Sequence, residues 1–359
     1  MPTISKGDYI LVTGASGFIA SHTALAFLNA GYRVRGSVRS EAKGEYLAKL
    51  FADKGESGFD YVLVDDITKD GVFDEAVKGV DAVAHLASPF YILDVKDPQD
   101  LIQPAIKGTT GLLKSIQKNN PNLKRVVVTS SSLAIYCMES KPPTYHFGLS
   151  LGLRSRPSYT EKDWNEDAVP HVEKMGLGSV GFHSYSASKV LAEKAFWKFI
   201  EDEKPSWDGV TVNPPLVIGP IIHECESPLK VNTSVAMFYV FAAGMKKEED
   251  LPAPYHGWVN VSDVALAHVR ALESPEAAGE RFITANGFVF GQDYCDVLHK
   301  RFPDLPNVPV GQPDTHEERN KQVPTFDGSK AAKVLGIKYT PFEETVVDMG
   351  NSLRERFTF

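Results

Sequence analysis

Short apolar runs alternate with longer amphipathic stretches through the first half of the chain. The runs are rich in β-branched residues and span residues 9–13, 33–38, 61–64, 82–86 and 125–129, with helical patterns between them. Strands that alternate with helices in this way form βαβ units, which build a parallel sheet covered on both faces. The pattern therefore predicts an α/β fold with a doubly wound parallel sheet.

The pattern loosens in the second half. Residues 138–183 are rich in Pro, Gly, Ser and aromatic residues, with no clear helical or strand period. Such long connections are usually functional lids or disordered segments. A helix is predicted over 185–203, and a last strand of the sheet over 210–218.

Beyond residue 218 we expect a smaller lobe that covers the carboxyl edge of the sheet. Its predicted helices span 231–245, 262–273, 328–335 and 342–356, with scattered short strands such as 282–284. We therefore divide the chain into a dinucleotide-binding domain at 1–213 and a mainly substrate-binding lobe at 214–359, some segments of which return to the first domain.

Composition and charge narrow the possible partners. Lys and Arg number 38 against 46 Asp and Glu, so the net charge of −8 gives no general attraction to nucleic acid or anionic lipid. The three cysteines are far apart, without a Cys-x-x-Cys spacing, and the N-terminus lacks a secretory signal. The most apolar stretch, 235–245, is shorter than the roughly 20 residues of a membrane helix. We expect a cytoplasmic monomer or homodimer without membrane or nucleic-acid partners.

The segment TGASGFIA at 13–20 follows the first predicted strand and begins a helix. Gly14 permits a tight turn, Gly17 lets the backbone approach a pyrophosphate, and Ala20 lets helix and strand pack closely. The helix N-terminus then presents free N–H groups to the anion. Glycine alone is weak evidence at such a turn, but the strand before it and the helix after it indicate a Rossmann-type dinucleotide site.

The end of the second strand indicates which dinucleotide is bound. An NAD-specific enzyme places Asp or Glu there for the adenosine ribose, whereas this chain has Arg39, with Lys43 one turn further on. These cations suit a 2′-phosphate, so we predict NADPH as the cofactor. Asp66, after the third strand, fits adenine contact and helix capping equally well.

The fifth strand runs into a hydroxyl-rich segment, 129–132, at the edge where open α/β sheets bind ligands. Further on, Tyr185 and Lys189 lie four residues apart on one predicted helix. We expect Lys189 to stabilise the phenolate of Tyr185, so that Tyr185 delivers a proton while Ser131 donates to the developing alkoxide. A lone Tyr-x-x-x-Lys is common by chance, and its order after a cofactor loop and a Ser-tipped strand supports the interpretation.

Together these stretches resemble the extended short-chain dehydrogenase/reductases, especially the branch of dihydroflavonol reductases and yeast NADPH-dependent methylglyoxal and aldehyde reductases. The similarity spans nearly the whole chain and is carried by 13–20, 36–40, 85–90, 127–131, 185–189 and 213–220. It implies an NADPH-dependent reductase of small-to-medium aldehydes or ketones, with Ser131 as the catalytic serine beside Tyr185 and Lys189.

The resemblance also implies the binding residues. At the cofactor we expect Gly14, Ser16, Gly17, Phe18, Ile19, Arg39, Lys43, Asp66, Ile67, Ala87, Ser88, Thr129, Tyr185, Lys189, Pro214, Val217 and Ser234. At the substrate we expect Phe90, Ser132 and Leu216.

Three departures from the family pattern concern the site. Lys107 stands where the family often carries Asn, which removes support for a proton relay there. Ser132 and Leu216 replace aromatic residues of the yeast enzymes, so we expect a more open pocket. Extra sequence at 142–157, with apolar residues at 145–149, fits either a lid or surface decoration.

Other activities share this fold. A hydroxysteroid-type dehydrogenase remains an alternative, and a sugar-nucleotide epimerase would be expected to carry a basic cluster in the second lobe. A non-catalytic NADP sensor commonly loses the Tyr–Lys pair, which this chain keeps. We expect no metal at 223–226, because adjacent residues on one loop rarely converge on an ion. His85 is expected to be a buried hydrogen-bonding residue.

Overall fold

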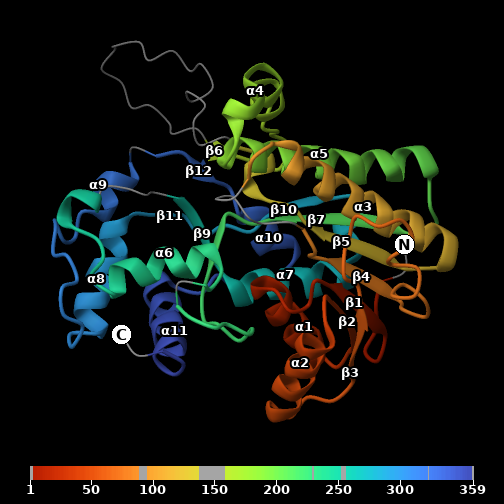
Figure 1. Cartoon of the computed structure of the whole chain (residues 1–359), viewed down its shortest axis with the longest axis horizontal. Coiled ribbons are helices and arrows are strands. Elements are labelled where there is room, and N and C mark those ends of the chain that lie inside the picture. The colour runs from red at the N-terminus through yellow and green to blue at the C-terminus, as the bar shows by residue number, and fades with distance from the viewer. Residues whose placement is uncertain are drawn as a thin grey trace.

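The computed structural model describes residues 3–88, 95–136, 158–228, 230–251, 256–321 and 323–357. Seven parallel strands form the central sheet, in the order β10-β7-β5-β4-β1-β2-β3 (Figure 1). Their bounds are β1 Tyr9–Thr13, β2 Arg33–Val38, β3 Phe59–Leu63, β4 Ala82–His85, β5 Arg125–Thr129, β7 Asp208–Asn213 and β10 Arg281–Ile283. The order reverses between β1 and β4, which is the position where such sheets bind dinucleotides. The predicted doubly wound fold is confirmed.

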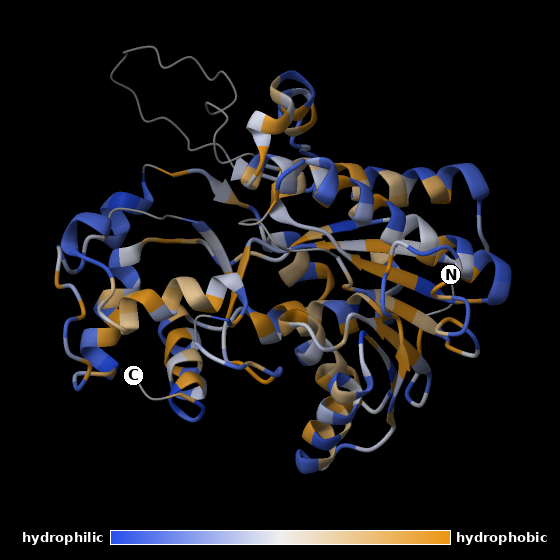
Figure 2. Cartoon of the chain, viewed as in Figure 1, coloured by the Kyte–Doolittle hydropathy of each residue, from blue (hydrophilic) through white to orange (hydrophobic). Residues whose placement is uncertain are grey.

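Helices cover both faces of this sheet. On one face lie α3 (Gln99–Asn119) and α5 (Phe182–Glu203); on the other lie α1 (Phe18–Asn29), α2 (Glu41–Asp53) and α7 (Val261–Glu273) (Figure 1). All residues of β1 and β4 are buried, which explains why these strands are continuous apolar runs. Figure 2 shows the same arrangement as an apolar sheet between helices with hydrophilic outer surfaces.

A smaller lobe is built around a three-stranded sheet in the order β11-β9-β8. These strands are β8 Leu216–Ile218, β9 His256–Asn260 and β11 Phe288–Val289. Around them lie α6 Thr233–Ala242, α8 Gly291–Arg301, α9 His316–Asn320 and α11 Phe342–Arg354 (Figure 1). The helix α10 (Ser329–Val334) packs against β10 of the large sheet. None of the described helices has the length and apolarity to cross a membrane.

Three expectations about the second half are corrected. The strand predicted over 210–218 is two strands in two sheets, because Pro214 and Pro215 cannot donate to a ladder and separate β7 from β8. The strand expected in the small lobe at 282–284 is β10, which pairs with β7 instead. Part of the connection thought to lack regular structure contains β6 (Ser158–Tyr159), which pairs with β12 (Thr325–Phe326), and α4 (Ala168–Met175). Helices α8 and α9 were not predicted.

A buried ion pair joins β5 to β7 at the amino-terminal edge of the sheet. Arg125 is fully buried and its guanidinium forms two bonds to Asp208, one of them Nη2 to Oδ2 at 3.0 Å. Its Nη1 also donates to the carbonyls of Ala271 and Ser274, at 2.7 and 2.6 Å, where α7 ends. This pair stabilises the sheet at the edge that lies away from the glycine-rich turn.

Candidate active site

The turn between β1 and α1 requires glycine at position 14. Gly14 has φ of +64°, and a Cβ there would lie 3.1 Å from the Cα of Ala87. The Gly14 N–H donates to Ser37 Oγ at 3.0 Å, which ties the turn to the end of β2. The β1–α1 turn and the segment after β4 are therefore in close contact, as expected at the point where the strand order reverses.

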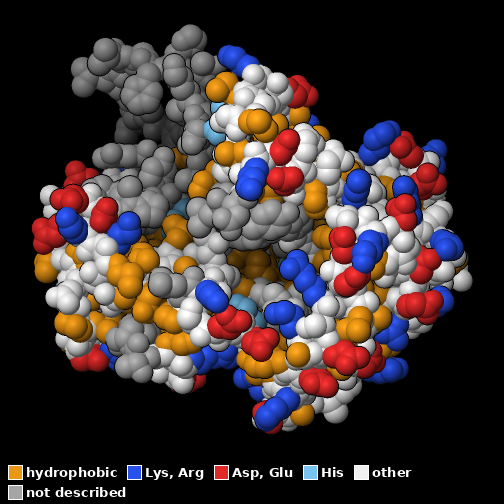
Figure 3. All heavy atoms as spheres, in the orientation of Figure 1, with side chains coloured by type: hydrophobic (Ala, Val, Ile, Leu, Met, Phe, Trp, Pro, Cys, Tyr) orange, Lys and Arg blue, Asp and Glu red, His pale blue; other side chains and the backbone are white. Residues whose placement is uncertain are grey.

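The N-terminus of α1 is suited to an anionic group. Gly17 precedes the helix without a side-chain cap, and the first turn carries no acidic residue. The first N–H groups of the helix and its positive dipole end therefore remain for a pyrophosphate, so this structure fits a dinucleotide here. A hollow lies between the two parts of the molecule, with a hydrophobic floor and Lys and Arg side chains along one side (Figure 3).

The two cations predicted to bind the 2′-phosphate differ in their surroundings. Arg39 is exposed at the end of β2, and no acidic side chain pairs with it in the described part of the chain. Lys43 Nζ lies 3.8 Å from Glu224 Oε2, and both side chains are partly exposed. Sequence reasoning did not connect Glu224, in the loop after β8, with this position, because the two residues are far apart in the chain.

Thr13 connects the ends of β1 and β4 through three hydrogen bonds. Its Oγ1 accepts from the N–H groups of Leu86 and Ala87, both at 3.0 Å, and lies 2.9 Å from Nδ1 of His85. The hydroxyl hydrogen therefore goes to Nδ1, which places the imidazole proton on Nε2. Burial, with a smaller effect of the Lys189 charge, lowers the pKa of His85 to about 3. His85 is a neutral, buried hydrogen-bonding residue, as predicted.

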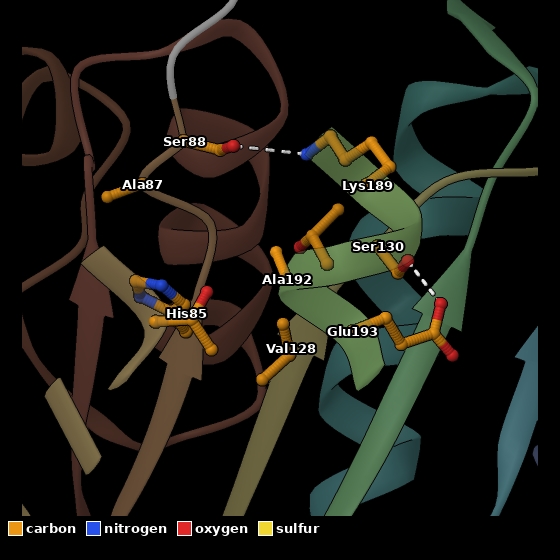
Figure 4. Close-up of a pocket in the computed structure, with 10 residues that line it drawn as sticks. His85, Ala87, Ser88, Val128, Ser130, Lys189, Ala192 and Glu193 are labelled. Carbon is orange, nitrogen blue, oxygen red and sulfur yellow. Dashed lines mark hydrogen bonds between the residues drawn. The ribbon is translucent and has the colours of Figure 1, made fainter. Parts of the chain in front are cut away.

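The predicted catalytic residues come together from β5 and α5. The hydroxyls of Ser131 and Tyr185 are hydrogen-bonded to each other. Lys189 Nζ lies 5.6 Å from the centre of the Tyr185 ring and donates to Ser88 Oγ at 3.2 Å (Figure 4). The structure thus places the nitrogen cation, the phenol and the serine hydroxyl in one group beside the turn after β4.

The three serines after β5 have different partners. Ser130 and Ser131 are successive residues of extended chain, so their side chains point in opposite directions. Ser130 Oγ donates to Glu193, whereas Ser131 Oγ faces Tyr185 and also accepts from the N–H of Leu133 at 3.1 Å. Ser132 begins a short 3-10 helix, η1, where it is buried. This alternation explains why Ser131 rather than Ser130 reaches the phenol.

The side chain of Thr129, predicted at the cofactor, has an intramolecular partner. Its hydroxyl lies 2.6 Å from Nε2 of His268, whose Nδ1 lies 2.8 Å from the carbonyl of Val264. Because a carbonyl only accepts, Nδ1 carries the proton and Thr129 donates to Nε2. The hydroxyl hydrogen of Thr129 is therefore donated to His268 in this structure, and not to a ligand.

Burial sets the protonation of Tyr185 and Lys189. It raises the pKa of Tyr185 above the ordinary value, and the hydrogen bond from Ser131 only partly opposes this effect. Burial also lowers the pKa of Lys189 to about 8, against the opposing effect of Glu193. We had expected Lys189 to lower the phenol pKa, but desolvation dominates in this structure. The phenol is neutral at physiological pH, which suits a proton donor.

A small space with both polar and apolar lining residues lies behind Lys189, between α3, α5 and the ends of β4 and β5. Figure 4 shows Lys189 and Glu193 projecting from α5 beside it, with Ser88 and Ser130 as their hydrogen-bond partners. It is lined by His85, Ala87, Ser88, Thr109, Val128, Thr129, Ser130, Lys189, Ala192 and Glu193. Glu193 is the member of this set that sequence reasoning missed, although its position one turn after Lys189 was a signal that could have found it.

Two predicted adenine contacts have structural partners. The carboxylate of Asp66 accepts from Thr68, from its N–H at 2.9 Å and its hydroxyl at 2.8 Å, so it caps a local turn. Ile67 packs against Gly108 of α3, where an added Cβ would lie 2.8 Å from its Cδ1. At the edge of the small lobe, Ser234 Oγ accepts from Asn232 at 2.6 Å at the start of α6.

The remaining predicted residues fall into three groups. At the start of α1, Phe18 is buried against the ring of His223, 5.4 Å away, while Ser16 and Ile19 are half-buried. After β7, the carbonyl of Pro214 accepts from the N–H of Ser132 at 2.9 Å, Leu216 is half-buried and Val217 is buried in β8. Phe90 and the insertion at 142–157 lie outside the described residues.

Two further positions were singled out in the sequence. Lys107 is exposed on α3. In the loop after β8, Cys225 Sγ lies 3.3 Å from Nε2 of His223. Within the described residues, no group of three or more His, Cys, Asp or Glu side chains is placed to hold a metal.

Comparison with known proteins identifies the family. Residues 10–150 match the NAD dependent epimerase/dehydratase family. A ketoreductase of Aspergillus niger is 37% identical over 98% of this chain and 99% of its own length. The NADPH-dependent methylglyoxal reductase of Saccharomyces cerevisiae is 33% identical, with 96% and 97% of the two chains covered. The crystal structure of Gre2 from Candida albicans in complex with NADPH has a TM-score of 0.85 and 31% identity, over 98% of this chain and 100% of that one. The chain therefore belongs to the extended short-chain dehydrogenase/reductases and is an oxidoreductase of the branch that contains the fungal ketoreductases and methylglyoxal reductases.

Proposed function

We propose that the protein is an NADPH-dependent reductase of small-to-medium aldehydes or ketones, with Tyr185 as the proton donor. The observation that carries this proposal is the group of Ser131, Tyr185 and Lys189 beside the β1–α1 turn. The relatives named as ketoreductase and methylglyoxal reductase support the carbonyl chemistry, and the NADPH named for the yeast enzymes supports the cofactor. Cytoplasmic location and a monomeric or homodimeric state remain predictions.

The reaction needs three actions from the residues of this chain. NADPH, when bound, supplies the hydride that adds to the carbonyl carbon. Ser131 donates its hydroxyl hydrogen to the carbonyl oxygen and stabilises the charge that develops there. Tyr185 then transfers its proton to that oxygen, which is a far stronger base than a phenolate, and the Lys189 cation stabilises the tyrosinate that remains.

The alternatives of the same fold have less support. A cofactor sensor does not need the assembled Ser131, Tyr185 and Lys189, whereas a reductase does. The ketoreductase and methylglyoxal reductase match nearly the whole chain. A substrate panel of aldehydes, diketones, β-ketoesters and aryl ketones, followed by the loss of NADPH absorbance, tests the proposal. We expect oxidation with at least one class, and none with any class would contradict it.

Arg39→Ala is expected to raise the KM for NADPH and leave that for NADH nearly unchanged. Removing one or two charge-assisted bonds to the 2′-phosphate corresponds to a change of roughly 10- to 100-fold. Lys43→Ala should have a smaller effect, because Lys43 is already close to Glu224. Steady-state kinetics with both cofactors measure the difference, and equal changes for NADPH and NADH would show that Arg39 does not bind the phosphate.

A further inference from the structure

We propose that Glu193 is a positioning residue of the active site: it holds the helix of Tyr185 and Lys189 against the strand end of Ser131 and places a negative charge behind Lys189. This inference rests on the proposed function and adds a residue to it. Glu193 is buried, with 1% of its surface exposed, on the helix α5 one turn after Lys189 and two turns after Tyr185. All three therefore lie along one side of the same helix.

The carboxylate of Glu193 joins α5 to three strands. Its Oε2 accepts from Ser130 Oγ, after β5, and from Asn213 Nδ2 of β7 at 2.8 Å. Its Oε1 accepts from Thr211 Oγ1 of β7 at 3.2 Å and from Arg281 Nε of β10 at 2.6 Å. A buried carboxylate is costly unless its oxygens are hydrogen-bonded and its charge is paired, and both conditions hold here.

Two hydrogen-bond partners of Glu193 hold the backbone at Ser131. Ser130, the residue before Ser131, is bonded to Glu193. Asn213, also bonded to Glu193, reaches the carbonyl of Ser131 at 3.3 Å. Because Tyr185 and Ser131 are hydrogen-bonded to each other, the position of α5 on β5 sets the geometry for proton transfer. A displacement of about 1 Å at such a group can reduce turnover on the order of 100-fold.

The counter-ion of Glu193 is itself anchored. Arg281 donates through Nη1 to the carbonyls of Glu161 and Asp163, at 2.6 and 2.8 Å, and its guanidinium lies 3.9 Å from the ring centre of Trp164. The alternative explanation is that Glu193 and Arg281 form an ordinary buried ion pair, which contributes to the stability of the fold and has no effect on the site. The pair of Arg125 and Asp208 is a matched reference for that explanation, since it joins the same β5 and β7 at their opposite ends.

Glu193 is the acidic side chain that acts on the charge of Lys189. Among the described residues, the titratable groups near Lys189 besides Glu193 are Tyr185 on the same helix and His85 on β4, and both are neutral at physiological pH. The neighbouring positions on α3 and β5 carry the hydroxyls of Thr109, Thr129 and Ser130. Burial lowers the pKa of Lys189 to about 8 and Glu193 opposes this change. Removing the carboxylate charge therefore lowers the pKa of Lys189 further.

The sign of the pH dependence follows from the required cation. Reduction by the proposed mechanism needs Lys189 protonated, so we expect the wild-type rate to fall as the pH rises above about 8. Glu193→Gln keeps the size of the side chain and one accepting oxygen but removes the charge, and its amide nitrogen places a donor where the second carboxylate oxygen accepted. We expect kcat to fall roughly 10- to 100-fold with a smaller change in the KM for NADPH, and the alkaline limb to move to lower pH by roughly one unit.

Asp208→Asn is the matched control, because it breaks a buried pair of the same type away from the site. It should lower the Tm while the alkaline limb stays at its wild-type pH. If Glu193→Gln does not accumulate as folded protein, the double variant E193Q/R281M removes the unpaired cation as well and carries the same readout. An alkaline limb at the wild-type pH in the folded Glu193 variant, or an equal shift in Asp208→Asn, would overturn the inference.

The same measurements separate this inference from the proposed function. If wild-type protein reduces a carbonyl with NADPH and Tyr185→Phe does not, the proposed function holds whatever Glu193→Gln shows. If none of the carbonyl compounds tested supports NADPH oxidation by the wild-type protein, the proposed function is contradicted, and the proposed role of Glu193 is contradicted with it.

Discussion

Tyr185→Phe is expected to lose most of its turnover with carbonyl substrates and to retain its fold and its affinity for NADPH. The phenol oxygen is the only atom removed, and it is bonded to Ser131 inside a buried site. General acid catalysis by a positioned side chain contributes about 10²- to 10⁴-fold, so kcat should fall within that range. Steady-state kinetics and a fluorescence titration with NADPH measure the two parameters separately.

The hydroxyl of another buried tyrosine provides the control. The Tyr32 hydroxyl donates to the Glu273 carboxylate at 2.8 Å. Tyr32 follows the C-terminal end of α1, whereas the glycine-rich turn precedes its N-terminal end. Tyr32→Phe should leave kcat near the wild-type value, although it changes stability. Turnover by Tyr185→Phe near the wild-type level would show that another group donates the proton.

Lys189→Met is expected to cause a loss of similar size, but with a different kinetic signature. Methionine has nearly the length of lysine without the charge, so the variant removes the cation proposed to stabilise the tyrosinate, together with the hydrogen bond to Ser88. We expect kcat to fall about 10²- to 10⁴-fold and the pH dependence above pH 8 to disappear, because the group that titrates there is gone.

Lys198→Met is the control on the same helix, since Lys198 is 72% exposed and pairs with Asp202 on the surface. Its rate and pH profile should match those of the wild type. A Lys189→Met enzyme with the wild-type alkaline limb would show that the limb belongs to another group.

The features that depend on local sequence were predictable. The five apolar runs correspond to β1 to β5. Burial explains the apolar character of β1, β4 and most of β5, whereas the edge strand β3 is only partly buried. Gly14 was expected at a tight turn, and the structure adds the close approach of Ala87 as a second reason. The spacing of Tyr185 and Lys189 placed them on one helical face, which the structure confirms.

The contacts that join distant segments were not predictable from a single sequence. Nothing in the local pattern connects Glu193 with Arg281, or Lys43 with Glu224, because the partners are brought together only by the fold. The divided strand at Pro214 was missed because both parts are apolar and only the prolines mark the break. The phenol pKa was expected to be lowered by Lys189, but the extent of burial, which decides its direction, depends on tertiary packing.

The most direct test of the account is hydride transfer itself. Incubation of the protein with a carbonyl substrate and NADPH that carries deuterium at both hydrogen positions of nicotinamide C4, followed by mass spectrometry of the alcohol, shows where the hydride goes. We predict one deuterium on the carbinol carbon of the product from wild-type protein, with product formation largely lost in Tyr185→Phe. Consumption of NADPH without a deuterated alcohol, or no reaction with any aldehyde or ketone tested, would contradict the assignment as a carbonyl reductase.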